Sequence, residues 1–279
     1  MSGPTTAREQ LPEALRRAVD QTVAAERLEG WRPTGAHLDA LAALLCGETC
    51  FDDYLAGAAA RHLPDTTPSR RDHWRALRRR QPYLIPGTTL LRNNFGVTHR
   101  QALADLEFVA TAGRIALWHR RSAHGGLVGQ DVDFRAVHRH VFADVYPWAG
   151  DYRVTELRRG DAVFAKHHAV PGAMAVIEQS ARTLAVSAER FDAAALGYQL
   201  ARLYAEYNQI HPFREGNGRT GTLLLHTVAA LCGHRLDLTG VTRDEWYSAS
   251  RDSMPFRRGS GAGGVNPRPF VPLLNRALG

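Results

Sequence analysis

Apolar residues recur at intervals of three and four along most of the chain, with polar residues between them. This spacing places apolar side chains on one face of a helix that packs against a core. The segment 12–29 is an example: it opens on Pro12, which suits a first helical turn, and Gly30 follows it, which suits a helix end. Its apolar positions are Leu15, Val19, Val23 and Leu28. The pattern predicts an all-α fold.

Further helices are predicted from capping residues and from the same period. Residues 35–46 have Thr34 as a cap and end before Gly47, and a third short helix follows Thr49. Later helices are expected after the capping pairs Ser69 with Asp72 and Thr98 with Gln101, after Asp133, and at 172–187, 192–208 and 223–231.

The helical period stops once, between residues 150 and 164. Tyr152 and Val154 alternate there with polar residues, and Gly160 with Asp161 forms a turn signal. We predict a small β-hairpin in this segment.

The stretch LPDTTP at 63–68 is rich in turn residues and indicates a boundary. We predict a helical module at 1–63, a connecting segment at 64–79, a main domain at 80–255 and a tail at 256–279. The tail contains the low-complexity stretch GSGAGG.

Composition supports a globular protein. Apolar residues make up 44% and charged residues 23% of the chain, which is enough for a core and argues against general disorder. We expect a cytoplasmic protein without a membrane partner, because no apolar run reaches eighteen residues and the first ten residues are polar. The three cysteines show no metal-ligand spacing and are expected to be reduced thiols.

The net charge of +7 comes almost entirely from arginine, because Lys166 is the single lysine among 35 basic residues. A basic surface can attract nucleic acid or a nucleotide. Arginines that are merely solvated on helix faces explain the charge equally simply. The second interpretation is favoured, because the arginine runs at 78–80 and 120–121 lack interleaved aromatic residues, so a nucleic-acid partner is not expected.

The segment 211–219 (HPFREGNGR) combines several chemical groups between two predicted helices. Its glycines let backbone N–H groups approach a ligand, and the start of the next helix favours an anion such as phosphate. Glu215 offers a hard oxygen ligand for Mg²⁺, and His211 offers a base near neutral pH. An anion would also explain Arg219 in a first helical turn, where the helix dipole disfavours a cation.

Each feature has a simpler explanation when it is taken alone. His211 could be an ordinary surface or core histidine, the glycines could form a turn, and Glu215 could be a first-turn acid. Their occurrence together within nine residues favours phosphate chemistry.

The segment resembles the signature of the Fic family, His-x-Phe-x-(Asp or Glu)-Gly-Asn-Gly-Arg-x-x-Arg, and matches it throughout 211–219. Residues 83–97, 141–152 and 205–211 are also similar to stretches of that family, so the resemblance extends over about 80–255. It implies an all-α fold and transfer of AMP from ATP to a Ser, Thr or Tyr hydroxyl of a target protein.

The resemblance also implies roles for individual residues. His211 would be the general base and Glu215 would hold Mg²⁺. The predicted phosphate ligands are Gly216, Asn217 and Gly218, with Arg219 for the leaving pyrophosphate. The hairpin, with Asp161, Val163 and Phe164, would be a flap that aligns the target segment as an added strand; a purely structural hairpin is the alternative.

One signature position differs: the last arginine is replaced by Thr222. A threonine cannot supply the charge of an arginine–phosphate contact. A transferase or hydrolase with another donor or acceptor is therefore an alternative, as is a module that binds a nucleotide without turnover.

The first sixty residues resemble the three-helix antitoxin that restrains some Fic toxins, whose inhibitory pattern is (Ser or Thr)-x-x-x-Glu-Gly. Here Glu29 and Gly30 keep the end of the pattern, while Ala25 replaces the hydroxyl residue. We predict an inhibitory Glu29 near the phosphate site, paired with Arg219 or another group. A solvated Glu29 at a helix end is the alternative.

Overall fold

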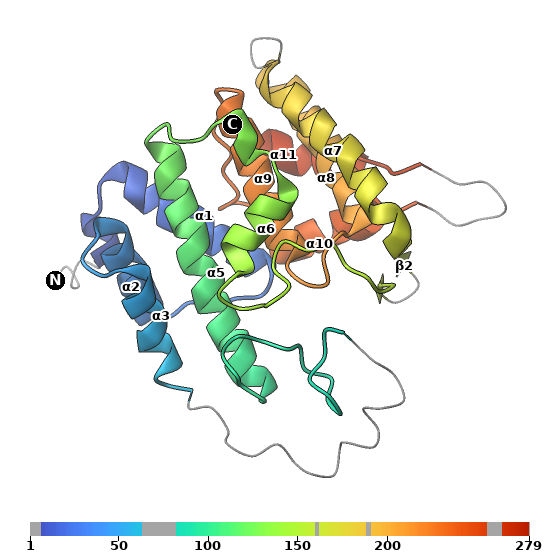
Figure 1. The fold of residues 1–279 in the computed structure, drawn as a ribbon. Helices are drawn as coiled ribbons and strands as arrows, with labels where there is room; N and C mark the ends of the chain where they lie inside the picture. The colour runs from blue at the N-terminus through green and yellow to red at the C-terminus, as the bar shows by residue number, and fades with distance from the viewer. Residues whose placement is uncertain (1–6, 63–81, 160–161, 188–190, 256–263, 279) are drawn as a thin grey trace.

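The computed structural model describes residues 7–62, 82–159, 162–187, 191–255 and 264–278. These residues form helices with one small pair of strands (Figure 1), so the predicted all-α class is confirmed. In chain order the elements are η1 (Ala7–Gln10), α1 (Glu13–Leu28), α2 (Gly35–Cys46), α3 (Phe51–Ala59), α5 (Arg100–Ala123), η2 (Gly129–Asp131), α6 (Phe134–Phe142), β1 (Arg158–Arg159), β2 (Ala162–Val163), η3 (His167–Ala169), α7 (Val170–Ala185), α8 (Ala193–Ile210), α9 (Asn217–Leu231), α10 (Arg243–Asp252), η5 (Arg268–Phe270) and α11 (Val271–Leu278).

Helix α9 lies at the centre of the molecule. It packs against α6, α7 and α8 and also meets α1 and α5, and 12 of its 15 residues are buried. Helices α1, α2 and α3 gather along α5, on the side away from α7 and α8 (Figure 1). Helix α9 therefore contacts helices from both halves of the chain.

The first three helices form the unit predicted at the N-terminus. Their apolar side chains share one core with the rest of the chain. One continuous apolar cluster includes Leu11 and Val19 as well as Leu274 near the other end of the chain. The predicted connecting segment lies entirely outside the described residues, so the boundaries at 63–64 and 79–80 stay predictions. Within the described part of the chain, no helix is long and apolar enough to cross a membrane.

Several helix limits follow the predicted caps. Helix α2 starts after Thr34, whose hydroxyl accepts the His37 N–H, and stops before Gly47 in the left-handed conformation (φ 78°). Helix α6 starts after Asp133, whose carboxylate accepts two backbone N–H groups. Helix α1 starts after Pro12 as predicted.

One predicted cap was wrong: helix α5 starts after His99, and Gln101 bonds to Asp105 along the helix instead of closing a capping box with Thr98. The third short helix follows Thr49 as predicted, with the Cys50 thiol as its cap. Helix α9 begins at Asn217, which puts Arg219 in its first turn as predicted, and it includes the predicted apolar run 223–231. The pair Ser69 with Asp72 lies outside the described residues.

The hairpin is present and its second strand contains Val163 as predicted, but its first strand is displaced from the predicted position. Strands β1 and β2 pair antiparallel, with Arg158 opposite Val163, whereas residues 152–155 form no strand. The physical reason is Arg153, which is only 1% exposed and turns into the protein to bind backbone carbonyl groups. The predicted turn at Gly160 and Asp161 lies outside the described residues.

Candidate active site

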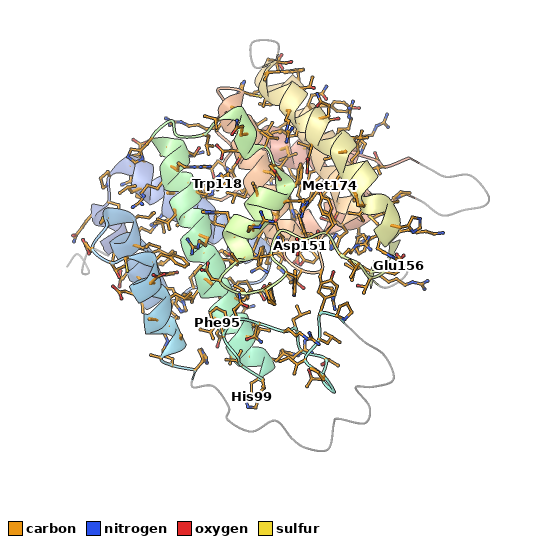
Figure 2. The ribbon with its side chains drawn as sticks, viewed as in Figure 1. Phe95, His99, Trp118, Asp151, Glu156 and Met174 are labelled. Atoms are coloured by element: carbon orange, nitrogen blue, oxygen red, sulfur yellow. The ribbon has the colours of Figure 1, made fainter. Side chains whose placement is uncertain are left out.

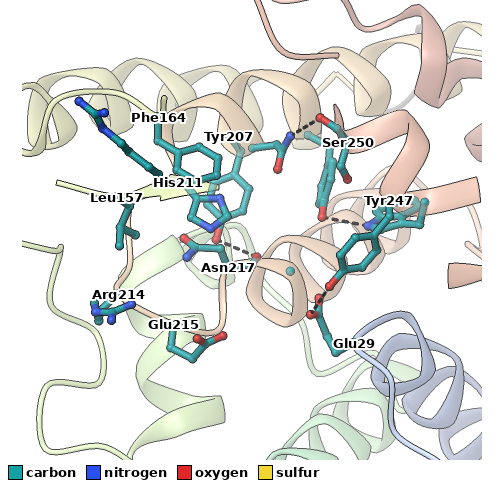
Figure 3. Close-up of a pocket in the computed structure, with 15 residues that line it drawn as sticks. Glu29, Leu157, Phe164, Tyr207, His211, Arg214, Glu215, Asn217, Tyr247 and Ser250 are labelled. Atoms are coloured by element: carbon teal, nitrogen blue, oxygen red, sulfur yellow. Dashed lines mark hydrogen bonds between the residues drawn. The ribbon is translucent and has the colours of Figure 1, made fainter. Parts of the chain in front are cut away.

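A pocket of about 170 Å³ lies where the loop between α8 and α9 meets the flap, α10 and the end of α1. Figure 3 shows His211 near its centre, with Phe164 above it and Glu29 on the opposite side from Arg214. The side chains that line it are Glu29, Leu157, Arg158, Phe164, Tyr204, Tyr207, Asn208, His211, Arg214, Glu215, Asn217, Trp246, Tyr247 and Ser250, and Gly218 completes the wall.

The loop has its shape because two residues take the left-handed conformation. His211 ends α8 with φ 50° and is the sole described non-glycine residue with positive φ. Gly216 precedes α9 with φ 81°, and a Cβ atom there would lie 2.3 Å from the Phe142 ring. Only glycine combines that backbone conformation with that close packing. The chain therefore turns sharply twice and exposes the first turn of α9 to the pocket.

Asn217 stabilises this turn through side-chain hydrogen bonds. Its carbonyl oxygen Oδ1 accepts the Phe213 N–H at 2.9 Å, and its Nδ2 donates to the Phe213 carbonyl at 2.9 Å. The Tyr207 hydroxyl donates to the Asn217 backbone carbonyl at 3.0 Å. Both side-chain polar atoms of Asn217 are thus used within the protein. The contact of Asn217 with a phosphate stays a prediction. The backbone N–H of Asn217 is the group that would make it.

The imidazole of His211 stacks on Phe164 of the flap, with ring centroids 3.9 Å apart and planes 12° apart. Arg153 holds the two segments together: its Nε donates to the His211 carbonyl at 2.8 Å, and its guanidinium also donates to Ala165. The backbone N–H of Arg153 donates to Pro212. The base of the hairpin, here called the flap, and the loop 211–216, here called the histidine loop, therefore form one hydrogen-bonded unit.

Glu215 lines the pocket beside the start of α9. Its Oε1 accepts the Gly216 N–H at 3.1 Å. Burial raises the pKa of Glu215, and the nearby carboxylate of Glu107 acts in the same direction. A bound cation would favour its ionised form.

Glu29 lies against the first turn of α9. Its Oε1 is 1.8 Å from the point where a Cβ atom on Gly218 would stand, so a residue larger than glycine at 218 would collide with it. The Tyr247 hydroxyl donates to Glu29 Oε2 at 3.4 Å (Figure 3). A carboxylate therefore occupies the helix start where an anion is electrostatically favoured.

Arg219 points away from the pocket. Its guanidinium donates to Glu107 and, at 3.1 Å, to the Thr111 hydroxyl, and it lies 3.8 Å from Glu26 Oε2. The residue is 4% exposed and does not line the pocket. In this structure its guanidinium is paired with Glu107 and lies beside Glu26. The predicted contact with pyrophosphate would require it to leave them.

Thr222 is also buried, at 2% exposure. Its hydroxyl donates to the carbonyl groups of Gly218 and Arg219 within α9. The position of the last signature arginine is therefore occupied by a residue whose polar group is satisfied inside its own helix.

The structure adds pocket residues that the sequence did not suggest. Arg158 and Arg214 are the described arginines in the lining, and Arg214 places positive charge on the side of the pocket opposite Glu29. Arg214 occupies an unspecified position of the signature, so the motif gave no signal for it. Tyr247 comes from α10, far along the chain, and only the fold brings it to the site.

Together the fold and the pocket define a helical protein with an imidazole, a carboxylate and a helix N-terminus around one candidate anion site. A sequence model of the Fic/DOC family matches residues 131–229. The chain is 34% identical over 161 residues to "Probable protein adenylyltransferase y4lH" of Sinorhizobium fredii, over 56% of this chain and 79% of that protein. It is 29% identical over 178 residues to "Probable protein adenylyltransferase Fic" of Escherichia coli, over 62% of this chain and 84% of that protein. The chain belongs to the Fic/DOC family.

Solved structures agree in fold. The BepC protein of Bartonella tribocorum with bound AMPPNP superposes with a TM-score of 0.59 at 20% identity, over 71% of this chain and 96% of that one. A Fic domain containing signaling protein of Bacteroides thetaiotaomicron gives a TM-score of 0.56 at 16% identity and covers 96% of this chain and 87% of that one. The second match therefore includes nearly all of the chain.

Proposed function

We propose that this chain is a protein adenylyltransferase, which transfers AMP from ATP to a Ser, Thr or Tyr hydroxyl of a target protein. The observation that carries the proposal is the common pocket of His211, Glu215 and the first turn of α9. The proposal also draws on relatives at 29% and 34% identity that are named probable protein adenylyltransferases. The BepC structure with AMPPNP supports ATP as the nucleotide.

In the proposed reaction the hydroxyl oxygen of the target attacks the α-phosphorus of ATP. His211 accepts the hydroxyl proton as the oxygen–phosphorus bond forms. The bond between the α-phosphorus and the bridging oxygen breaks, and pyrophosphate leaves. We propose that the backbone N–H groups of Asn217 and Gly218 stabilise the phosphates, joined by that of Gly216 when it leaves Glu215.

Glu215 fits the role of the Mg²⁺ ligand. It is a carboxylate in the pocket wall, and burial together with Glu107 raises its pKa. Such a group gains most from a cation nearby. When bound, Mg²⁺ would neutralise charge on the phosphate oxygens. The chain's own contribution is to hold the carboxylate against Gly216, at the edge of the anion site.

The flap is proposed to align the target. Among the described residues, strands β1 and β2 pair only with each other, so a target segment could pair with the outer edge of one of them. Phe164 follows β2 directly and stacks on His211, which would place the paired segment beside the base. We assign Asp161 and Val163 to the same role.

We also propose that Glu29 inhibits the enzyme, as in an antitoxin-like module fused to its toxin. Its carboxylate lies against Gly218, where a phosphate would be bound. A pocket of about 170 Å³ is smaller than the roughly 300–1,000 Å³ typical of ligand sites, so ATP needs this side chain to move. Of the two predicted possibilities, Arg219 or another group, the second fits the contact at Glu29, because the Tyr247 hydroxyl donates to its carboxylate.

The test is incubation with α-labelled ATP, Mg²⁺ and candidate target proteins. Glu29→Gly should increase labelling of protein over the wild-type chain. Adding His211→Ala to Glu29→Gly should lower the labelling rate about a hundredfold or more. The matched control is His234→Ala in the same background, because His234 lies outside this pocket. Equal labelling with and without His211 would overturn the proposed base, and equal labelling with and without Glu29 would overturn the inhibition.

A second candidate is favoured by Thr222, which leaves the last signature arginine without a replacement at its position. This candidate is a transferase of the same fold with a different nucleotide or phosphate donor. The same assay with labelled GTP, CTP and UTP separates the two. Labelling of the target by one of these donors, and not by ATP, would select the second candidate.

A further inference from the structure

The two ends of the flap meet outside the pocket. Glu156 lies two residues before β1, and His167 and His168 form the short helix η3 after β2. Figure 2 shows Glu156 at the edge of the molecule, beside the N-terminal end of α7. The backbone N–H and Nδ1 of His167 lie 3.3 and 2.7 Å from Glu156 Oε1. These residues therefore close the hairpin at its base.

This cluster has the donor set of a metal site. Glu156, His167 and His168 each offer a ligand atom, and the three atoms lie within 4.8 Å of one another. Ligand atoms around a tetrahedral zinc ion lie roughly 3.3 Å apart, so a small rotation of the side chains would bring them into range. The carboxylate and His168 are exposed and His167 is half-buried, which leaves them free to rotate. In the described part of the chain, no other group of three such residues comes this close.

The ligands select the class of metal. Two imidazoles and one carboxylate suit zinc and its neighbours among the transition metals, whereas Mg²⁺ prefers oxygen ligands. The site would thus differ in metal from Glu215. Arg153 lies 3.9 Å from Glu156 Oε2, which opposes a cation, but its guanidinium is already directed to backbone carbonyls of the flap and the histidine loop.

We propose that Glu156, His167 and His168 bind one divalent transition metal ion of the zinc type, which fastens the base of the flap. The carboxylate comes from the segment entering the hairpin and both imidazoles from the segment leaving it. A shared ion would restrict their separation. Because Arg153 and Phe164 connect this base to His211, the ion would stiffen the surface that receives the target.

The test measures zinc binding by the full chain, without an affinity tag, by competition with a chromophoric chelator in excess Mg²⁺. The background carries Cys46→Ser and Cys50→Ser, since these exposed thiols could bind zinc on their own. We expect one zinc ion per chain. His168→Ala and Glu156→Gln should each weaken binding by about tenfold or more, since even residues around a metal ligand have effects of that size. His234→Ala is the matched control and should bind as the background does.

His168 is the most informative position, because it is exposed and its described contact is the edge-on ring of His167, so its removal should leave the fold intact. Hydrogen exchange supplies a second readout: zinc should slow exchange at 156–159 and 162–168 in the background protein and not in His168→Ala. Zinc binding that is equal in all variants, or no binding at all, would overturn the proposal. Neither measurement requires transferase activity, so failure here leaves the test of His211 unaffected.

Discussion

At the scale of single residues, the unusual feature is one buried guanidinium among several carboxylates. The negative charges of four carboxylates act on Arg219 and raise its pKa: those of Glu107, Glu26, Glu29 and Glu215. The four carboxylates together exceed its charge, and burial makes uncompensated charge costly. Burial accordingly raises the pKa of Glu26 to about 8, although Arg219 acts to lower it. Glu26 is therefore expected to hold a proton at neutral pH while Thr111 donates to it.

This protonation predicts how stability depends on pH. Below pH 4.5 Glu26 is protonated in both the folded and the unfolded chain, so it contributes no slope. Between pH 4.5 and about 8 only the unfolded chain releases the proton, so rising pH favours unfolding. The free energy of unfolding should fall by up to about 1.4 kcal/mol per pH unit from this group.

Urea unfolding of the wild type and Glu26→Gln between pH 5.5 and 7.5 measures the effect. Glutamine keeps the shape and cannot ionise, so the variant should show a shallower decline and should be the more stable protein at pH 7.5. Parallel declines in the two proteins would mean that another group, such as Glu215, releases the proton.

The residues of the motif were predictable, because His211, Glu215 and the glycines adjoin one another in the sequence. Their partners were not. Glu26 and Glu107 lie far from Arg219 along the chain and meet it only because α1 and α5 pack together. A local pattern can show that a cation stands in a first helical turn, but it cannot show that buried carboxylates rather than a ligand surround it.

At the scale of elements, the helices followed the sequence where a side chain caps its own helix, as Thr34 and Asp133 do. The first strand of the hairpin differs from the prediction because Arg153 binds residues that are distant in the sequence. Alternation around Tyr152 predicted a strand, yet Arg153 turns inward to bind carbonyl groups of the flap and the histidine loop, and this holds the segment out of the ladder. The first strand therefore forms several residues later, at 158–159, and pairs with 162–163, where the second strand was predicted.

This contact predicts that Arg153 is a positioning residue for the loop. Arg153→Met would leave the buried carbonyl group of Ile210, and the partly buried ones of Thr155, Ala165 and His211, without this donor. Each unsatisfied group costs about 1–3 kcal/mol. We expect a lower free energy of unfolding and a slower transfer rate, with ATP affinity nearly unchanged because Arg153 does not line the pocket.

The measurements are chemical denaturation, ATP binding and labelling rate, each in the Glu29→Gly background. Arg135→Met is the control, since Arg135 is about half exposed and its guanidinium bonds to Gly150 instead of the histidine loop. A loss of ATP affinity as large as the loss of rate would show that Arg153 acts on the nucleotide and not on the loop.

At the scale of the whole molecule, the N-terminal helices share the core with the rest of the chain. Val19 and Leu28 of α1 are at most 1% exposed and belong to the same apolar cluster as α5 and α9. Gln21 is buried as well, and its amide bonds to Asp237 and to the Leu238 N–H near the other end of the chain. The sequence indicated a separable module because turn residues follow it, but a boundary in the sequence carries no information about shared packing.

This packing predicts that the N-terminal unit cannot be removed without unfolding the protein. Burying an aliphatic side chain contributes about 1.5–3 kcal/mol, so loss of the α1 face removes more than the roughly 5–15 kcal/mol that stabilises a typical domain. A chain of residues 82–279 should show no cooperative thermal transition by circular dichroism. Coexpression with residues 1–62 as a separate chain should restore the transition, because the two parts bury the same surfaces. By contrast, Glu29→Gly should melt cooperatively, since it removes one half-buried side chain at the end of α1. If the 82–279 chain melts cooperatively near the wild-type temperature by itself, the first three helices are a dispensable regulator and the shared core is not needed for folding.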